Sequence, residues 1–178
     1  MFYYDYNLEE IKGFWNWNVS NWPVTNGLYQ MFYCCYRLKE INFSNWTTTK
    51  FAFGADGKCD LRYFARECYC LKKLNMSPFN INAINSLTYY SQNANGSRSY
   101  SPFYLCYNLE ELTLPSNYKG HIDMSEMYKL PRSEFIKTFN ALSSSPIGTT
   151  AKVWIIGTKY KLTTADIAIA TNKGYTVV

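Results

Sequence analysis

Two pairs of neighbouring carboxylates are the residues whose type and spacing could support acid and base catalysis. They are Glu9 with Glu10, and Glu110 with Glu111. A glycan-cleaving enzyme uses such a pair, with one carboxyl group as the acid and the other as a base or nucleophile. Both pairs, however, follow a leucine and precede an apolar residue in the same short pattern. Because the pattern recurs, it indicates a repeated surface position, and we expect no enzymatic activity.

Metal chemistry is the next possibility, because cysteine and histidine are ligands that zinc prefers. The six cysteines show neither a double Cys-x-x-Cys spacing nor a paired disulfide framework, and Cys68 and Cys70 are separated by a single residue. His121 is the only histidine in the sequence. We therefore expect no metal site and no cofactor.

The composition of the 178-residue chain limits its partners. Charged residues make up 17%, and the net charge of +5 is spread along the chain, so nucleic acid is not favoured as a partner. Aromatic residues reach 19%, with 17 Tyr and 5 Trp. Such a mixture with Asn and Ser is typical of recognition surfaces, although wide rings can equally fill an elongated core. No apolar run is long enough to span a membrane, and residues 1–6 lack the features of a signal peptide.

A repeated module provides the elements that would position these residues. Segments with a Leu-x-x-Leu or Leu-x-x-Ile pattern recur at intervals of roughly 30 to 38 residues, a period typical of stacked units. They begin at Leu8, Leu38, Leu71 and Leu109. The residues before each leucine also recur, and Cys35, Cys68 and Cys106 occupy the same position. We predict that these cysteines are buried, because free cysteine packs like a small hydrophobic residue.

These modules resemble the BspA-like class of leucine-rich repeats, found in surface proteins of host-associated bacteria and in some of their phages. A unit of that class typically combines a Met-Phe-x-x-Cys turn, a Leu-x-x-Leu-x-Leu segment and a polar return rich in Asn, Ser and Thr. The segment from Leu162 to Tyr175 also resembles the frequent C-terminal ending of the family. The resemblance implies a solenoid fold. It also implies adhesion to a host surface, a matrix protein or a cell envelope, or receptor binding for a phage protein.

The fold class that we predict is α/β: a leucine-rich-repeat solenoid with about five short parallel strands, an irregular or helical convex side and a helical C-terminal cap. One domain covers residues 1–178, with repeats at about 1–30, 31–63, 64–101 and 102–132 and a cap at 133–178. In the cap we expect a helix over 133–142, a last strand over 151–157 and a helix over 166–172. Thr163 or Thr164 is expected to cap the last helix, and Gly174 to end it. The inward residues of this helix are predicted to be Ile167, Ala168 and Ala170.

Polar side chains form two rows on the solvent face of the expected sheet, because alternate residues of a strand share a face. The first row is Glu10, Glu40, Lys73 and Glu111, and the second row is Lys12, Asn42, Asn75 and Thr113. Trp15, Trp17 and Trp22 do not fit the core positions of the repeat, whereas Trp46 and Phe79 do. We predict a binding face in which these three tryptophans are exposed anchors beside the two polar rows.

A non-enzymatic recognition or adhesion module is the function that the sequence favours. Its partner is expected to be a protein or glycan on a cell surface, and its location extracellular, on a cell surface or on a virion. The first alternative is a structural component of a virion or fibre, and the second is a glycan-active enzyme that uses its aromatic residues as sugar platforms. Because no polar cap precedes Met1, we also expect self-association or a further domain at that end.

Overall fold

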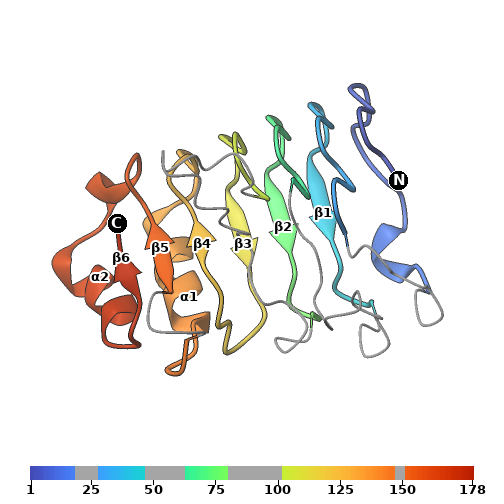
Figure 1. Cartoon of the computed structure of the whole chain (residues 1–178). Helices are drawn as coiled ribbons and strands as arrows, with labels where there is room; N and C mark the ends of the chain where they lie inside the picture. The colour runs from blue at the N-terminus through green and yellow to red at the C-terminus, as the bar shows by residue number, and fades with distance from the viewer. Residues whose placement is uncertain (19–27, 47–62, 80–101, 147–150) are drawn as a thin grey trace.

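The structure is a computed structural model that describes residues 1–18, 28–46, 63–79, 102–146 and 151–178. Short strands and helices form a mixed α/β arrangement, in which the strands lie side by side along the molecule (Figure 1). The N-terminus lies at one end of this row and the C-terminus near the other. In chain order the elements are η1 (Phe14–Asn16), β1 (Glu40–Asn42), β2 (Lys73–Asn75), β3 (Glu111–Thr113), β4 (Ile122–Asp123), α1 (Arg132–Ala141), β5 (Lys152–Trp154), η4 (Lys159–Lys161), α2 (Thr164–Thr171) and β6 (Thr176–Val177). The predicted α/β class with short parallel strands is confirmed.

The first sheet contains β1, β2 and β3, which are parallel and hydrogen-bonded in that order. The three strands share one burial pattern: the first residue is exposed, the second is buried and the third is half-buried. This alternation arises because successive side chains of a strand point to opposite faces. Ile41, Leu74 and Leu112 occupy the central positions and are buried in the core. The segments that begin at Leu38, Leu71 and Leu109 therefore align in the register that their spacing predicts.

The second sheet contains β4, β5 and β6, which are also parallel. The prediction that residues 151–157 form the last strand was wrong, since β5 is shorter and β6 follows the last helix. Gly174 ends that helix region with a φ of 89°, a conformation that favours glycine. The chain then turns back, and Thr176 and Val177 pair with Lys152 and Val153.

The first unit of the repeat forms no strand within residues 1–18. Gly13 stands where the later units have an apolar residue directly after the strand, and its φ of 69° turns the chain into η1 instead. Phe14 of this short helix is buried and packs against Trp46, with ring centroids 4.7 Å apart. Trp46 and Phe79 are both buried, which confirms the prediction that they fill the core.

A tight turn precedes each Leu-x-x-Leu or Leu-x-x-Ile segment. In four modules, one residue of this turn has a positive φ although it is not a glycine. These residues are Tyr4, Cys34, Glu67 and Leu105. A left-handed conformation costs about 1–2 kcal/mol for such a residue. Backbone hydrogen bonds between successive turns offset this cost. The N–H of Cys34 donates to the carbonyl of Arg66, and the N–H of Glu67 donates to the carbonyl of Tyr104.

A fifth copy of the hydrogen-bond pattern of this turn, which the cysteine spacing did not predict, lies at residues 124–130. The N–H of Met127 donates to the carbonyl of Met124, and the N–H of Leu130 donates to the carbonyl of Met127. Cys35 and Leu38 make the equivalent bonds in the second module. Met127 therefore stands in the cysteine position, and it is buried as the cysteines are.

The three cysteines in the shared position are fully buried, as predicted. Each thiol donates a hydrogen bond to a backbone carbonyl of the preceding module: Cys35 to Phe2 at 3.0 Å, Cys68 to Phe32 at 3.1 Å and Cys106 to Ala65 at 3.1 Å. Burial raises the pKa of the Cys35 and Cys106 thiols to about 12 and raises the pKa of Cys68 well above its ordinary value. At neutral pH these thiols remain protonated, so they are poor nucleophiles.

We expect thiol labelling of the folded chain to distinguish these cysteines from Cys70, which is exposed. Iodoacetamide at pH 8 should modify Cys70, while Cys35, Cys68 and Cys106 react only after urea is added, and fragment ions distinguish Cys68 from Cys70 within their shared peptide. Mass spectrometry of the digested chain provides the measurement. Modification of Cys68 at the rate of Cys70 in the folded chain would contradict the buried packing of this position.

The two helices lie at the C-terminal end of the molecule and confirm the predicted cap helices to within about two residues. Thr163 caps α2: its side chain accepts from the N–H of Asp166, whose carboxylate accepts in return from the N–H of Thr163. Arg132 at the start of α1 makes two hydrogen bonds to the same carboxylate, at 2.8 and 2.9 Å. Of the inward residues predicted for α2, Ala170 is buried, whereas Ile167 and Ala168 are half-buried. No helix in the described ranges is long and apolar enough to cross a membrane.

Candidate functional site

The structure brings most of the two predicted polar rows together on the first sheet. Glu40, Lys73 and Glu111 are register partners, and so are Asn42, Asn75 and Thr113. These side chains largely satisfy one another: Lys73 Nζ lies 2.7 Å from Glu111 Oε1, and Asn42 Nδ2 donates to Glu40 Oε1 at 3.2 Å. Glu10 and Lys12 are exposed but lie outside any strand. The first row therefore contains one ion pair, Lys73 with Glu111, and a carboxylate held by an amide of the second row.

The predicted tryptophan anchors do not form one exposed cluster among the described residues. Trp15 is 39% exposed on η1. Trp17 is half-buried and packs on the core, with its ring centroid 5.1 Å from that of Phe14 and 6.3 Å from that of Phe2. Trp22 lies outside the described residues. Trp15 thus remains a candidate anchor, whereas the surroundings of Trp17 are those of a core-packing residue.

A column of stacked tyrosines runs across the repeated turns, and we call it the tyrosine ladder. Its members are Tyr6, Tyr36, Tyr69, Tyr107 and Tyr128. Successive ring centroids are 4.9, 4.9, 6.2 and 5.7 Å apart, and successive ring planes differ by 29°, 27°, 11° and 20°. The first and last rings are 47% and 44% exposed, and those between them are half-buried. One tyrosine from each of five successive modules therefore reaches the same surface.

A second column lies three residues before the ladder tyrosine in four modules and consists of three tyrosines and one arginine: Tyr3, Tyr33, Arg66 and Tyr104. Tyr3 and Tyr33 have ring centroids 5.7 Å apart, and Arg66 stands in the equivalent place of the third module. The Arg66 guanidinium lies 5.9 Å from the Tyr33 ring centroid and 4.8 Å from the Tyr104 ring centroid. A guanidinium at such distances is attracted to the negative ring faces. Arg66 also pairs with Glu67 at 3.1 Å, so the column combines phenol groups with a positioned ion pair.

The hydroxyl groups of Tyr36, Tyr69 and Tyr107 stay protonated at physiological pH. A hydrogen bond with Cys34 raises the pKa of Tyr36 to about 12. Burial raises the pKa of Tyr69 and Tyr107, and the nearby Glu67 and Glu126 carboxylates raise these values further. Because all three phenols stay neutral, they offer no nucleophile, and the Tyr69 hydroxyl already donates to Glu67 Oε2 at 3.5 Å.

Sequence reasoning missed the ladder, although the signal was present. Each ladder tyrosine directly follows the cysteine position of its module, which Asp5 fills in the first unit and Met127 in the fifth. The recurring cysteines and leucines of the modules predicted only the core residues. A polar residue that recurs in register beside a buried position is the corresponding signal for a repeated surface.

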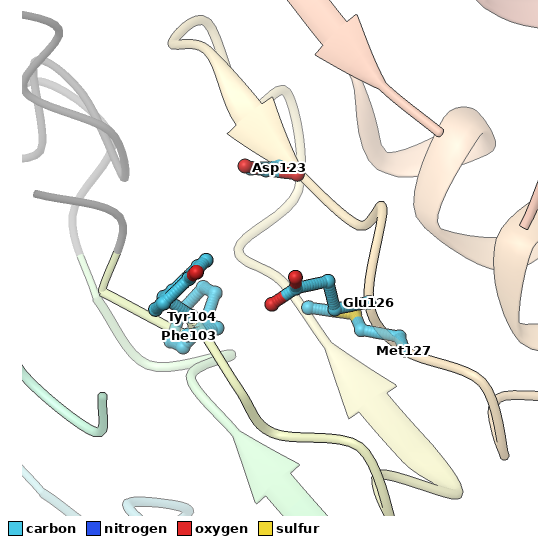
Figure 2. A pocket seen from close by; sticks show the side chains of 5 residues that line it. All are labelled: Phe103, Tyr104, Asp123, Glu126 and Met127. Atoms are coloured by element: carbon cyan, nitrogen blue, oxygen red, sulfur yellow. The ribbon is translucent and has the colours of Figure 1, made fainter. Parts of the chain in front are cut away.

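A small depression in the described part of the chain is lined by two carboxylates and could be considered as an enzyme site. Figure 2 shows Phe103 and Tyr104 on one side of it and Glu126 and Met127 on the other, with Asp123 on β4. Its volume of about 180 Å³, which includes open solvent, is below the range of about 300–1,000 Å³ typical of small-molecule sites. Both carboxylates bind backbone: Glu126 accepts from the N–H of Leu105 at 3.1 Å, and Asp123 accepts from the N–H of Ser125 at 3.0 Å. These contacts indicate a role in holding the turns together.

Metal ligands do not gather anywhere in the described part of the chain, where no group of three or more His, Cys, Asp and Glu residues could hold an ion. His121 is half-buried, and its Nδ1 accepts a hydrogen bond from the N–H of Lys152 at 3.0 Å. Burial lowers the pKa of His121, which favours this neutral, accepting form.

Among the described residues, the tyrosine ladder is the arrangement best suited to contact another molecule. Comparisons of the chain with protein-family models, with curated proteins and with solved structures found no match.

Proposed function

We propose that this chain is a leucine-rich-repeat solenoid of the BspA-like class and works as a non-enzymatic recognition or adhesion module. The in-register parallel strands, the repeated turns and the cysteine column support the solenoid, since each module buries its apolar face against its neighbours. The partner is a protein or a glycan on a cell surface. The chain acts outside the cell, on a cell surface or on a virion.

The observation that carries this proposal is the exposed edge of the tyrosine ladder. A core needs no hydroxyl-bearing ring at the surface of every module, yet one tyrosine recurs there in five successive modules. Tyrosine and arginine are enriched in the residues that dominate binding energy at interfaces, because they bury large areas and lose little conformational freedom. Arg66 and the second aromatic column widen the same surface.

A binding screen tests the proposal. The labelled full chain is applied to a glycan array and to a panel of purified cell-surface proteins. The double variant Tyr36→Ser/Tyr69→Ser and the control variant Lys73→Ser/Glu111→Ser are applied in parallel. We expect at least one partner that binds the wild type and the strand-face control but loses signal with the ladder variant.

Circular dichroism of both variants verifies that they keep the parent fold. A partner that is lost with the strand-face variant and kept with the ladder variant would overturn the assignment of the binding face. A chain that binds nothing on either the array or the panel would contradict the recognition function itself.

A further inference from the structure

The tyrosine ladder places equivalent parts of neighbouring phenol rings against each other. Its members occupy one position of successive modules, directly after the cysteine position, so their side chains have equivalent surroundings. Tyr36 and Tyr69 have ring centroids 4.9 Å apart and ring planes that differ by 27°. In such a stack, the carbons beside the hydroxyl group of one ring face the matching carbons of the next ring. This is the arrangement from which two phenols can be joined through these carbons.

Other tyrosine contacts do not combine the short separation and the small angle of the Tyr36–Tyr69 pair. Tyr3 and Tyr33 have centroids 5.7 Å apart and planes that differ by 43°. Tilted rings turn an edge of one toward the face of the other, so their matching carbons are not opposed. Within the ladder, Tyr69 and Tyr107 are nearly parallel, at 11°, but their centroids are 6.2 Å apart.

Tyr69 also has a base beside its hydroxyl group. The hydroxyl donates to Glu67 Oε2 at 3.5 Å. Oxidation of a phenol at neutral pH releases the hydroxyl proton together with one electron, so a neighbouring carboxylate that accepts the proton favours the reaction. Tyr6 and Tyr36 are also stacked at 4.9 Å, with planes that differ by 29°, but among the described residues no carboxylate accepts from the Tyr6 hydroxyl. The geometry and the base together therefore favour Tyr36 with Tyr69.

We propose that Tyr36 and Tyr69 form an oxidative cross-linking site, at which a small diffusible one-electron oxidant joins the two rings as dityrosine. Each phenol loses one electron and its hydroxyl proton, and each resulting radical shares its unpaired spin with the carbons beside the oxygen. Two of these carbons, one from each ring, form a carbon–carbon bond. The hydrogen on each bonded carbon then moves as a proton to the phenol oxygen, which restores both aromatic rings. Two oxidant molecules are each reduced by one electron, two protons pass to water, and the product lacks two hydrogen atoms.

The bond would connect two successive modules covalently. These modules otherwise interact through packing and through hydrogen bonds, such as that from the Cys70 N–H to the Tyr36 carbonyl. A covalent link between them restricts the unfolded chain, as a disulfide does. We therefore expect the cross-linked chain to unfold at a higher urea concentration than the untreated chain. This inference does not rest on the recognition function.

Photo-oxidation of the full chain tests the proposal. The oxidant is tris(bipyridine)ruthenium(III), generated by light and persulfate, and the chain is kept dilute so that links between chains are rare. Exposed Cys70 is first blocked with iodoacetamide, because thiols are also oxidised. Tryptic peptide 67–72 contains Tyr69 as its only tyrosine, and peptide 13–37 contains Tyr36. We expect mass spectrometry to find these two peptides linked, with the loss of two hydrogens and with fragment ions that place the link at Tyr36.

Matched variants locate the reaction. Tyr69→Phe keeps the ring but removes the hydroxyl group, and it should abolish this link. Tyr160→Phe is the control: Tyr160 is the most exposed tyrosine that the structure describes, at 77%, and lies outside the ladder, so the yield should be unchanged. Circular dichroism before oxidation verifies that each variant is folded. Oxidation of the wild type in urea should also abolish the specific link, since the stack exists only in the folded chain.

Two further variants test the chemistry of the pair. Glu67→Gln removes the base, so it should slow cross-linking at neutral pH, and the difference should shrink at alkaline pH, where hydroxide accepts the proton. The Cys34 thiol is hydrogen-bonded to Tyr36 and can return a hydrogen atom to its radical. Cys34→Ser should therefore raise the yield.

Three outcomes would overturn the inference. The first is a folded wild type in which Tyr160 is oxidised but no dityrosine forms within the chain. The second is a link from Tyr36 to Tyr6 in place of Tyr69. The third is an equal yield of the specific link from Tyr69→Phe and Tyr160→Phe.

Discussion

Replacing Phe43 by alanine should lower the free energy of unfolding by about 3–5 kcal/mol, the usual cost of truncating a fully buried phenylalanine. Phe43 is 0% exposed. Its ring lies 4.6 Å from that of Trp46, 4.8 Å from that of Phe79 and 5.3 Å from that of Phe14, centroid to centroid. The truncation leaves a cavity among rings from three successive modules, which cannot all move inward together. Urea denaturation followed by tryptophan fluorescence gives the measurement.

The neighbouring residue provides a matched control for this prediction. Ser44 is exposed, and the contact at this residue is made by its backbone N–H, which donates to Asn42 Oδ1. Ser44→Ala should therefore change the free energy of unfolding by no more than about 0.5 kcal/mol. A Phe43→Ala chain as stable as the Ser44→Ala chain would mean that the aromatic core between the modules is not packed as described.

The leucine and cysteine spacing predicted the parts of the fold that depend on burial. Residues recurring at one position of a repeat meet the same neighbours, so the pairing of Leu74 with Leu112 could be predicted from the sequence. Burial of Cys68 followed from the same argument. The helix ends could be predicted because Thr163 and Gly174 act locally, through a side-chain cap and a left-handed backbone.

Features that depend on competition between local and distant interactions were not predicted. Strand β6 exists because the two residues after Tyr175 find a partner in β5, a contact that the local sequence does not reveal. The left-handed turn at Cys34 and Glu67 has no glycine to indicate it, since the bonds between turns stabilise the conformation. The absence of a strand in the first unit, within residues 1–18, was not predicted either, although Gly13 there replaces the apolar residue of the later units.

The candidate site was predicted less well than the core. The polar rows lie in register, yet their charges pair within the chain, as Lys73 and Glu111 do. Sequence position alone could not show that Trp17 packs against Phe14. The ladder depends on ring stacking between modules, which becomes visible only when the side chains of Tyr36 and Tyr69 are placed.

The second large effect is expected at the centre of the ladder. Tyr69→Ala should weaken binding of the partner recovered by the screen by about 2 kcal/mol or more, which is about 30-fold in affinity, because a tyrosine near the centre of an interface commonly dominates its energy. Tyr69 lies between Tyr36 and Tyr107, so its loss also interrupts the row of hydroxyl donors. Lys73→Ala, on the exposed strand face, should cost well under about 1 kcal/mol.

The ratio of these two affinities, measured by surface plasmon resonance on chains whose folding has been verified, tests the recognition function and its surface together. We predict that Tyr69→Ala binds at least about tenfold more weakly than Lys73→Ala at equal folded fraction. Equal affinities for the two variants, or a larger loss for Lys73→Ala, would contradict the account that the tyrosine ladder is the recognition surface.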